Sequence, residues 1–261
     1  MDELGRGQDH VAYVTDGNTV VRVASGPDAR ARVEREARLL ARVAELTELP
    51  VPRPTAVDPE TGSLSYELLP GVPLIELPGD VRERAARPVA GELGLLLRAL
   101  HAVDPERVRD LVEVDDQPLD SWLADAAADY EAVASAIPEG HRSVVEQFLA
   151  TAPPPRGDEL VFSHNDLGIE HVLVDPASLA VTGVIDWSDA ALCDPAYDFG
   201  LILRDLGSEA LAAAYATYGK ELCARVRFYA RCALLEDLAY GIENARERYI
   251  AKSVTALDWL F

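Results

Sequence analysis

The sequence is poor in positive charge, and this shortage excludes two classes of partner. Against 45 aspartates and glutamates it has only 24 lysines and arginines, so the formal net charge is −21. A chain this acidic repels the phosphate backbone of nucleic acids and anionic lipid headgroups. We therefore expect no nucleic acid and no membrane as partner, whereas the same field attracts small cations.

Cysteine and long apolar runs are also scarce. Cys193, Cys223 and Cys232 form no Cys-x-x-Cys pair and are too few to cross-link 261 residues. No apolar run reaches the roughly 18 residues that span a bilayer, and the N-terminal residues lack the apolar core of an export signal. These absences predict a reducing compartment, and we expect the protein in the cytoplasm.

What remains is the composition of a folded chain, with 49% hydrophobic and 26% charged residues. The first quarter reads as strands at 10–13 and 19–24 around an Asp16-Gly17 turn, which predicts a hairpin. An amphipathic helix is expected at 28–46 and two more strands at 55–57 and 63–68, before the prolines of 70–73 end this part.

The rest of the chain is mainly helical, with short strands in its middle. Helical spacing of apolar residues predicts one helix that ends near His101 and another over 122–133. Apolar runs at 160–162, 171–174 and 181–185 predict buried strands. Helical spacing then returns from Asp198 almost to Phe261. The pattern predicts an α+β fold with a small β-rich N-terminal lobe at 1–69 and a larger, mostly helical C-terminal lobe at 70–261.

Acidic residues stand at the ends of two of these inner strands. Asp166 and Asp186 each follow an apolar run. Burying a lone carboxylate is costly unless a cation or hydrogen-bond donors compensate, so two that converge predict a divalent metal ion. The competing interpretation is that both residues cap turns or helices, as aspartate often does.

Three motifs extend this observation: His164-Asn165-Asp166 with His171 five residues after the aspartate, Ile185-Asp186-Trp187, and Asp194-Pro195-Ala196-Tyr197-Asp198. In this order and spacing they resemble the signature of the aminoglycoside and macrolide phosphotransferases, which are relatives of the protein kinases. The resemblance implies a kinase-like bilobal fold. It also implies transfer of the γ-phosphate of ATP or GTP to a hydroxyl of a small molecule, with Mg²⁺ as cofactor.

The resemblance assigns roles to the motif residues. Asp166 matches the catalytic carboxylate that orients the attacking hydroxyl, and Asp186 matches the Mg²⁺-binding aspartate. His171 stands where most members have asparagine, and imidazole is a poorer Mg²⁺ ligand than an amide oxygen. We expect its neutral Nε2 to bind the metal or a metal-bound water; the alternative is a packing residue at the start of a strand.

Other positions match supporting residues. His164 and Asp198 correspond to residues that brace the catalytic loop, and Asp194 is expected to bond backbone N–H groups in its turn. All three are assigned structural support. His101 is also expected to be structural, and Glu170 is expected to face solvent.

Nucleotide-binding residues are implied in the N-terminal lobe. Arg22 matches the basic strand residue that contacts the phosphates, and Glu36 its ion-pair partner; Glu34 is the alternative because the sequence does not fix the helix phase. Residues 66–71 resemble the hinge between lobes, where the backbone of Glu67 and Leu69 faces the purine. Two glycines, Gly5 and Gly7, are candidates for backbone contact with phosphate, although the strand before them is expected to be short or absent.

The acceptor is expected to be a small cationic molecule, because acids alternate with aromatics in the last helices. The preferred cluster is Glu236, Asp237, Tyr240 and Glu243. Charged helix residues usually face water, which is the alternative for each. We expect a macrolide or aminoglycoside as acceptor. A choline, homoserine or sugar kinase on the same fold, and an inactive nucleotide-binding regulatory relative, are the alternative functions.

Overall fold

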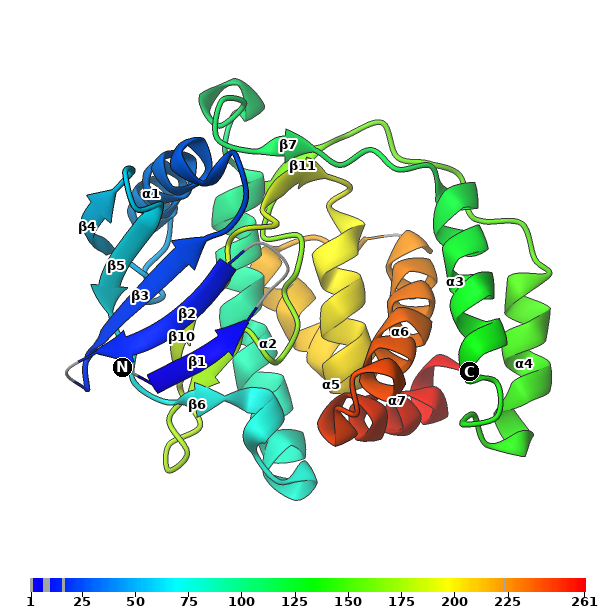
Figure 1. Cartoon of the computed structure of the whole chain (residues 1–261). Coiled ribbons are helices and arrows are strands. Elements are labelled where there is room, and N and C mark those ends of the chain that lie inside the picture. Colours follow the sequence, from blue (N-terminus) through cyan, green and yellow to red (C-terminus); the bar gives the residue numbers. More distant parts are fainter. Residues whose placement is uncertain (1, 7–9, 16, 223) are drawn as a thin grey trace.

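A five-stranded antiparallel sheet forms the N-terminal part of the protein, with strands in the order β1-β2-β3-β5-β4 (Figure 1). The computed structural model describes residues 2–6, 10–15, 17–222 and 224–261. The elements of this part are β1 (Asp2–Arg6), β2 (His10–Thr15), β3 (Thr19–Ala24), α1 (Ala29–Leu46), β4 (Pro54–Asp58) and β5 (Ser63–Glu67).

The predicted hairpin and helix of this part are confirmed. In the hairpin, His10 pairs with Ala24 and Thr15 with Thr19. Helix α1 buries Val33, Leu39, Leu40 and Val43, which recur at helical spacing. Gly5 lies inside β1 opposite Ala12, so it belongs to a short strand and not to a phosphate-binding loop. Gly7 lies outside the described residues.

Helices make up most of the remaining chain (Figure 1). Its elements are β6 (Val72–Pro73), η1 (Leu74–Glu76), α2 (Gly79–His101), η2 (Pro105–Arg107), β7 (Glu113–Val114), α3 (Leu119–Val133), α4 (Glu139–Leu149), β8 (Val161–Ser163), β9 (Val172–Val174), β10 (Val181–Val184), β11 (Ala191–Cys193), α5 (Ala196–Tyr218), α6 (Arg225–Glu243) and α7 (Glu247–Leu260). The expected change from strands to helices along the chain is therefore present.

Two small sheets join the helices to the N-terminal part, in the orders β10-β9-β6 and β7-β11-β8. The sequence patterns predicted β8, β9 and β10 but not β6, β7 or β11, and not helix α4. Gly71 precedes β6 with φ +102°, and a Cβ atom there would lie 2.2 Å from Thr182 Oγ1. Only glycine fits this position, where the chain crosses from one part of the protein to the other.

The core of the helical part lies between α2 and α5, which run side by side (Figure 1). Leu93, Leu97 and Leu100 of α2 are buried there together with Phe199 of α5. Cys193 and Cys232 are also buried and free, while Cys223 lies outside the described residues. In the part of the chain that the structure describes, no helix is long and apolar enough to cross a bilayer.

Candidate active site

The loop from Ser163 to His171 connects β8 to β9 and carries Asp166. Asp198, at the start of α5, holds the first residues of this loop: its Oδ2 accepts hydrogen bonds from the backbone N–H groups of His164 (3.0 Å) and Asn165 (3.3 Å). Asn165 has φ +63°, a left-handed conformation that nonglycine residues rarely adopt. The contacts of Asp198 hold the chain in this turn, just before Asp166.

His164 links this loop to the turn that carries Asp186. Its buried ring accepts a hydrogen bond from the Asp166 N–H at Nδ1 (3.3 Å) and donates from Nε2 to the carbonyl of Ile185 (3.0 Å). Burial and the nearby His171 lower the pKa of His164 to about 3, so the ring stays neutral. A neutral imidazole with its proton on Nε2 is what these two contacts require.

A hairpin of β9 and β10 brings His171 and Asp186 together. The two strands are antiparallel with Val172 opposite Val184, so the residue before β9 and the residues after β10 meet at one end. The Ile185 N–H donates to the His171 carbonyl at 2.9 Å. The metal-ligand candidates thus lie at neighbouring ends of one hairpin, 15 positions apart in the sequence.

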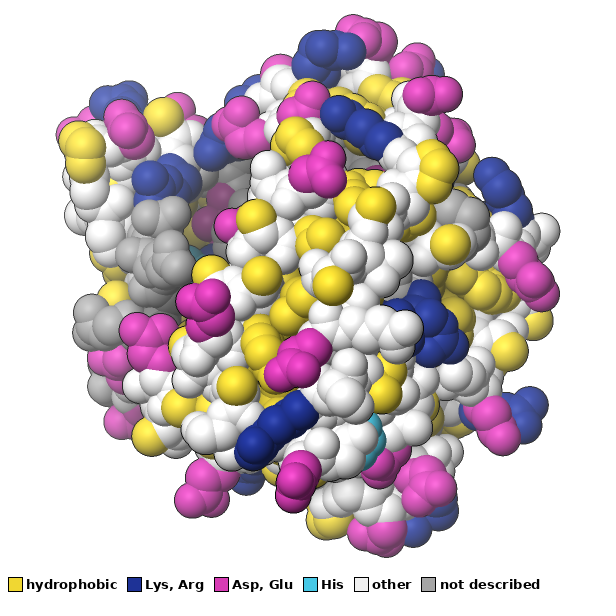
Figure 2. Space-filling model, turned by 90° about the vertical axis from the view of Figure 1, so that its right-hand side faces the viewer, with side chains coloured by type: hydrophobic (Ala, Val, Ile, Leu, Met, Phe, Trp, Pro, Cys, Tyr) yellow, Lys and Arg dark blue, Asp and Glu magenta, His cyan; other side chains and the backbone are white. Residues whose placement is uncertain are grey.

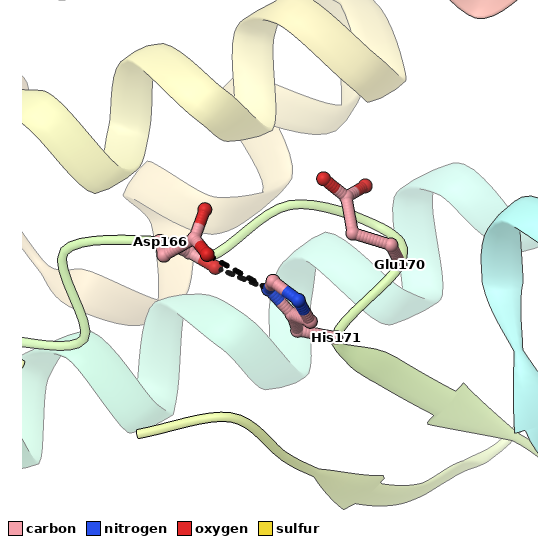
Figure 3. A group of neighbouring side chains, drawn as sticks. All are labelled: Asp166, Glu170 and His171. Carbon is pink, nitrogen blue, oxygen red and sulfur yellow. Dashed lines mark hydrogen bonds and ion pairs between the residues drawn. The ribbon is translucent and has the colours of Figure 1, made fainter. Parts of the chain in front are cut away.

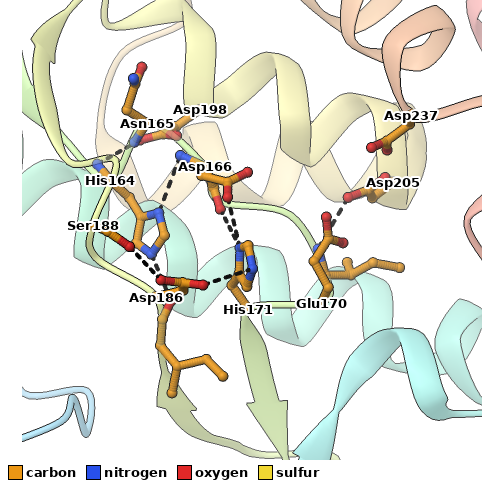
Figure 4. Close-up of polar contacts among 12 residues, drawn as sticks. His164, Asn165, Asp166, Glu170, His171, Asp186, Ser188, Asp198, Asp205 and Asp237 are labelled. Carbon is orange, nitrogen blue, oxygen red and sulfur yellow. Dashed lines mark hydrogen bonds and ion pairs between the residues drawn. The ribbon is translucent and has the colours of Figure 1, made fainter. Parts of the chain in front are cut away.

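His171 lies between the two aspartates (Figure 4), and Figure 3 shows its contacts with Asp166. Its Nδ1 is 2.8 Å from the carbonyl oxygen of Asp166 and 3.3 Å from the Oδ2 of the same residue, while its Nε2 is 3.8 Å from Asp186 Oδ2. Burial alone would lower the pKa of His171, but the carboxylates of Asp166, Glu170 and Asp186 raise it above its usual value.

Asp186 is surrounded by hydrogen-bond donors. Its Oδ1 accepts from Arg22 (3.2 Å) and from the hydroxyl of Ser188 (2.7 Å). Burial would raise the pKa of this carboxyl, but Arg22 and His171 hold it well below its usual range. Asp186 has φ +60°, so both aspartate-bearing turns contain a left-handed residue that is not glycine.

The surroundings of Asp166 have the opposite effect. Desolvation in the cleft raises its pKa to about 8; His171 opposes this shift and the negative charge of Glu170 adds to it. The side chain is 40% exposed, against 29% for Asp186. Asp166 is therefore the carboxyl of the pair that is open to an incoming molecule and has a high proton affinity.

Arg22 of β3 reaches the site from the N-terminal sheet. Its guanidinium lies 3.2 Å from Glu36 of α1 and 3.2 Å from Asp186, and its side chain is only 7% exposed. Glu34, the alternative partner, instead pairs with Arg30 on the surface at 3.5 Å. Burial lowers the pKa of Arg22, but Glu36 and Asp186 outweigh it and raise the pKa above the usual value.

A cleft of about 390 Å³ opens beside these charges. It is lined by residues of β3 and α1, by 111–113, and by 186–190. In Figure 2 a hollow with acidic side chains inside it separates the protruding smaller part from the main body, and carboxylates are spread over the whole visible face. Glu67 and Leu69 lie at the crossing between the two parts, where the Leu68 N–H donates to the Asn18 carbonyl at 2.8 Å.

The donor atoms at Asp186 fit a divalent cation. Oδ1 is occupied by Arg22 and Ser188, while Oδ2 faces His171 Nε2. In the neutral ring, the Nδ1 contact with the Asp166 carbonyl places the proton on Nδ1 and leaves the Nε2 lone pair for a cation at Asp186. Mg²⁺ holds its ligands at about 2.1 Å, so two ligands lie roughly 3 to 4 Å apart, as these atoms do.

Two further predicted residues have structural contacts. Asp194 accepts from the Ala196 N–H (2.9 Å), as expected for its turn, and its other oxygen pairs with Arg225 (2.5 Å). His101 lies between Ser163 (3.0 Å) and Tyr218 (2.9 Å), which is a structural environment.

The predicted acceptor cluster divides into two groups on α6. Tyr240 and Glu243 are exposed, whereas Glu236 has an exposed surface but a carboxyl group that is partly desolvated. Asp237 is buried, and its Oδ2 lies 2.8 Å from Lys252 and 3.0 Å from Arg204. The carboxylate of Asp237 is therefore engaged in these two ion pairs.

Glu236 faces acidic residues of α3. Burial raises the pKa of Glu236, and the negative charges of Asp237, Asp129 and Asp125 raise it further. The pKa of Asp129 is likewise raised by burial and by Asp125. This acidic surface of α3 and α6 combines residues that the sequence patterns selected with two that they missed, because the packing of α3 on α6 is not visible in the sequence.

The expectation for Glu170 is wrong. Its side chain is 12% exposed and pairs with Lys252 at 3.0 Å, so it does not face solvent. Lys252 is 82 positions away, and no local pattern marks it as a partner. Ser188, two residues after Asp186, was also missed, although its position next to the Ile185-Asp186-Trp187 motif was a usable signal.

Comparison with known proteins identifies the class to which this fold and site belong. The sequence pattern of the phosphotransferase enzyme family matches residues 2–235, so the chain belongs to this family. Viomycin phosphotransferase of Streptomyces vinaceus is 32% identical over 168 residues. That match covers 62% of this chain and 53% of the relative, so it spans about half of the relative's length.

Two solved structures are similar over nearly the whole chain. The GDP complex of wild-type aminoglycoside 2′-phosphotransferase-IIIa has a TM-score of 0.70 at 21% identity, covering 98% of this chain and 90% of that one. Macrolide 2′-phosphotransferase MphH from Brachybacterium faecium has a TM-score of 0.64 at 25% identity, covering 98% and 91%. The kinase-like α+β fold implied by the sequence resemblance is thereby confirmed.

Proposed function

We propose that this protein transfers the γ-phosphate of ATP or GTP to a hydroxyl group of a small cationic antibiotic, of the aminoglycoside or macrolide kind. The observation that carries the proposal is the arrangement of Asp166 and Asp186 on either side of His171, with Asp186 lining the cleft. Family membership and the nucleotide complexes of similar structures support it. A cytoplasmic location, where both nucleotides are available, is part of the proposal.

Asp166 accepts or orients the proton of the acceptor hydroxyl. Its raised pKa makes it a stronger base than an ordinary carboxylate, and its exposure leaves it open to the acceptor. In phosphoryl transfer the protein contributes mainly the alignment of the two reactants and the stabilisation of charge. Asp198 and His164 support this alignment by fixing the backbone on both sides of Asn165.

The other end of the site holds the nucleotide phosphates. Arg22, kept in place by Glu36, directs its guanidinium toward the cleft, where a planar fork suits bidentate contact with phosphate oxygens. Asp186 and His171 are the residues that would hold Mg²⁺, which when bound neutralises charge on the phosphates. Glu67 and Leu69 offer backbone groups to the purine at the crossing between the two parts.

The acceptor is proposed to lie against α6 and α3. Glu236 and Asp129 are carboxyls whose pKa values are raised by burial and by neighbouring negative charges, so a positively charged ligand relieves an unfavourable arrangement. Amino groups supply that charge in kanamycin-like and macrolide molecules. Tyr240 and Glu243, further along α6, extend the same exposed surface.

A phosphate-transfer assay tests the function. Purified protein, Mg²⁺ and radiolabelled ATP or GTP are incubated with aminoglycosides, macrolides, viomycin, choline, homoserine and simple sugars. We expect transfer to an antibiotic, loss of transfer in Asp166→Ala with nucleotide binding retained, and loss of Mg²⁺-dependent nucleotide binding in Asp186→Ala. Transfer only to a metabolite would replace the acceptor class, and near-normal turnover by Asp166→Ala would refute the role of Asp166.

A further inference from the structure

Five charged side chains form a buried cluster behind the loop that carries Asp166. We call it the ion cluster; its members are Glu170, Arg204, Asp205, Asp237 and Lys252. Their side chains are between 2% and 13% exposed. They come from the loop itself and from α5, α6 and α7, so the cluster joins the last three helices of the chain to the candidate active site. Figure 4 shows three of its carboxylates, Glu170, Asp205 and Asp237.

Lys252 is the centre of the ion cluster. Its Nζ lies 2.8 Å from Asp237, 3.0 Å from Glu170 and 3.1 Å from Asp205. A compact ammonium with three donors suits three converging carboxylates, whereas the flat guanidinium of Arg204 binds Asp205 through two parallel contacts of 2.8 Å. The chain has 22 arginines and only two lysines, and one of the two lysines occupies this position.

The ion cluster holds the loop at two consecutive residues. Asp205 Oδ2 accepts the backbone N–H of Ile169 at 3.1 Å, and Lys252 binds the side chain of Glu170. Glu170 directly precedes His171, and Asp166 lies four residues before Glu170. Both ends of the segment that the ion cluster anchors are therefore residues of the proposed reaction site.

We propose that Lys252 is a positioning residue, which acts through Glu170 to set the placement of Asp166 and His171. The inference rests on the proposed function. Without Lys252, three buried carboxylates would share the single cation Arg204, and Glu170 would be repelled from Asp205 and Asp237. The segment 167–170 would then lose its side-chain anchor, and the two reactive side chains at its ends would shift.

The expected effect is specific to one half of the reaction. Arg22, Glu36 and Asp186 come from β3, α1 and the end of β10, and they contact one another and not the ion cluster in the contacts described above. Nucleotide affinity measured without Mg²⁺, which does not depend on His171, is therefore expected to survive the loss of Lys252. A misplacement of about 1 Å at the reacting groups can cost about 100-fold in rate, so the loss falls on kcat.

The first test compares Lys252→Met with Lys220→Met, which removes the other lysine at an exposed position. For Lys252→Met we expect kcat to fall about 100-fold, with the nucleotide Kd from calorimetry in Mg²⁺-free buffer within twofold of wild type and Lys220→Met unchanged. A folded Lys252→Met that keeps kcat within twofold of wild type, or that loses nucleotide affinity in Mg²⁺-free buffer as much as kcat, overturns the proposal.

A second variant keeps the test decisive if Lys252→Met does not fold. Glu170→Met leaves two carboxylates and two cations in the ion cluster, so the charges balance, yet the loop loses the same anchor. We expect a similar fall in kcat. Because Lys252 acts through Glu170, the double variant should be no slower than the slower single variant. Rate losses that multiply in the double variant contradict this route.

A third measurement needs no substrate. Hydrogen exchange of the backbone amide of Ile169, followed by mass spectrometry of loop peptides, should be at least about tenfold faster in Lys252→Met than in Lys220→Met. Unchanged exchange refutes the positioning role even if turnover changes. Faster exchange in a protein whose wild type transfers no phosphate supports the anchor and counts against the proposed function alone.

Discussion

Asp166 and Asp186 are the same residue type and contact the same histidine, yet their surroundings shift their pKa values in opposite directions. Arg22 and His171 hold the pKa of Asp186 well below its usual range although burial would raise it. Desolvation raises the pKa of Asp166 to about 8, and the nearby His171 does not reverse that shift. The difference is the guanidinium, which contacts one carboxyl and not the other.

Opposed pKa shifts within one pair of carboxyls are a sign of divided labour. A carboxyl that stays ionised under all ordinary conditions suits a cation, and a carboxyl with a high proton affinity suits proton transfer. Arg22, which is remote in sequence from both aspartates, therefore accounts for much of the difference between their pKa values. Substitutions that remove a charged partner or a buried titratable group test this dependence.

Removing the guanidinium of Arg22 should abolish the difference between the pKa values of Asp166 and Asp186. In Arg22→Met, Glu36 and Asp186 would remain buried without their cation, so we expect about 3–5 kcal/mol lower free energy of unfolding. Urea denaturation at pH 7 measures it. The matched control is Arg30→Met, whose pairs with Glu34 and Glu60 are exposed and should cost less than about 1 kcal/mol. Equal losses in the two variants would show that Arg22 has no special role.

Burial without a charged partner should also lower the pKa of His101, a histidine outside the cleft. Burial lowers the pKa of His101 from 6.5 to about 4. The unfolded chain therefore binds more protons between these values, and stability is lost as the pH falls through that window. Between pH 7.5 and pH 5 we expect a loss of about 2 kcal/mol from this residue.

His101→Gln is the variant that isolates this effect. Glutamine does not titrate, so the pH-dependent loss should be smaller in the variant than in the wild type by the same amount. Chemical denaturation of both proteins at the two pH values supplies the four free energies. Parallel pH curves would mean that His101 is not held neutral by burial.

Glu236 and Glu243 lie on the same helix, but we expect only Glu236, which faces the acidic residues of α3, to affect the binding of a cationic acceptor. Glu236→Gln removes a charge that a cationic acceptor would neutralise, so we expect the KM for that acceptor to rise about tenfold with kcat little changed. Glu243→Gln, at an exposed position about two turns further along α6, should change the KM less than twofold. A larger effect at Glu243 would move the acceptor site along the helix.

The smallest expected effect is the one that most directly tests the opposite pKa shifts of Asp166 and Asp186. In metal-free buffer, Asp166→Asn should be more stable than wild type by an amount that grows as the pH rises from 4 to 8, because the pKa of this carboxyl is raised on folding. Asp186→Asn should be less stable at neutral pH, and its deficit should shrink as the pH falls below 4. We expect about 1 kcal/mol for the partly exposed Asp166.

Thermal or urea unfolding across this pH range reads out both variants. Slopes of the same sign would contradict the opposite environments of the two residues. Asp166→Asn and Asp186→Asn are matched in size and in the charge removed, so any difference between them reflects position alone.

Local patterns predicted the parts of this molecule whose causes are local. The hairpin at 10–24 and the helix at 28–46 follow from a turn dipeptide and from helical periodicity, and both are confirmed. The fold class and the family follow from three motifs in one short segment. The strand boundaries on either side of His171 and Asp186 were nearly right, so these two residues were correctly placed at strand ends.

The sequence could not reveal contacts between distant helices. Asp237 and Glu170 were interpreted as exposed or ligand-facing because isolated acids on helices and loops usually are. Their partner Lys252 lies on the last helix, and only tertiary packing brings it to both. Strands β7 and β11 were missed for a similar reason: each has two or three residues, and their pairing joins positions near 113 and 191.

The crossing at Gly71 limits how the cleft can change shape. The strand that follows it, β6, pairs with β9, and β9 begins directly after His171. Thr182 on the neighbouring strand donates to the Pro70 carbonyl at 2.6 Å. The connector is thus hydrogen-bonded to the hairpin that carries His171 and Asp186. We therefore expect a change in the width of the cleft to come from the N-terminal sheet and not from rotation about this connector.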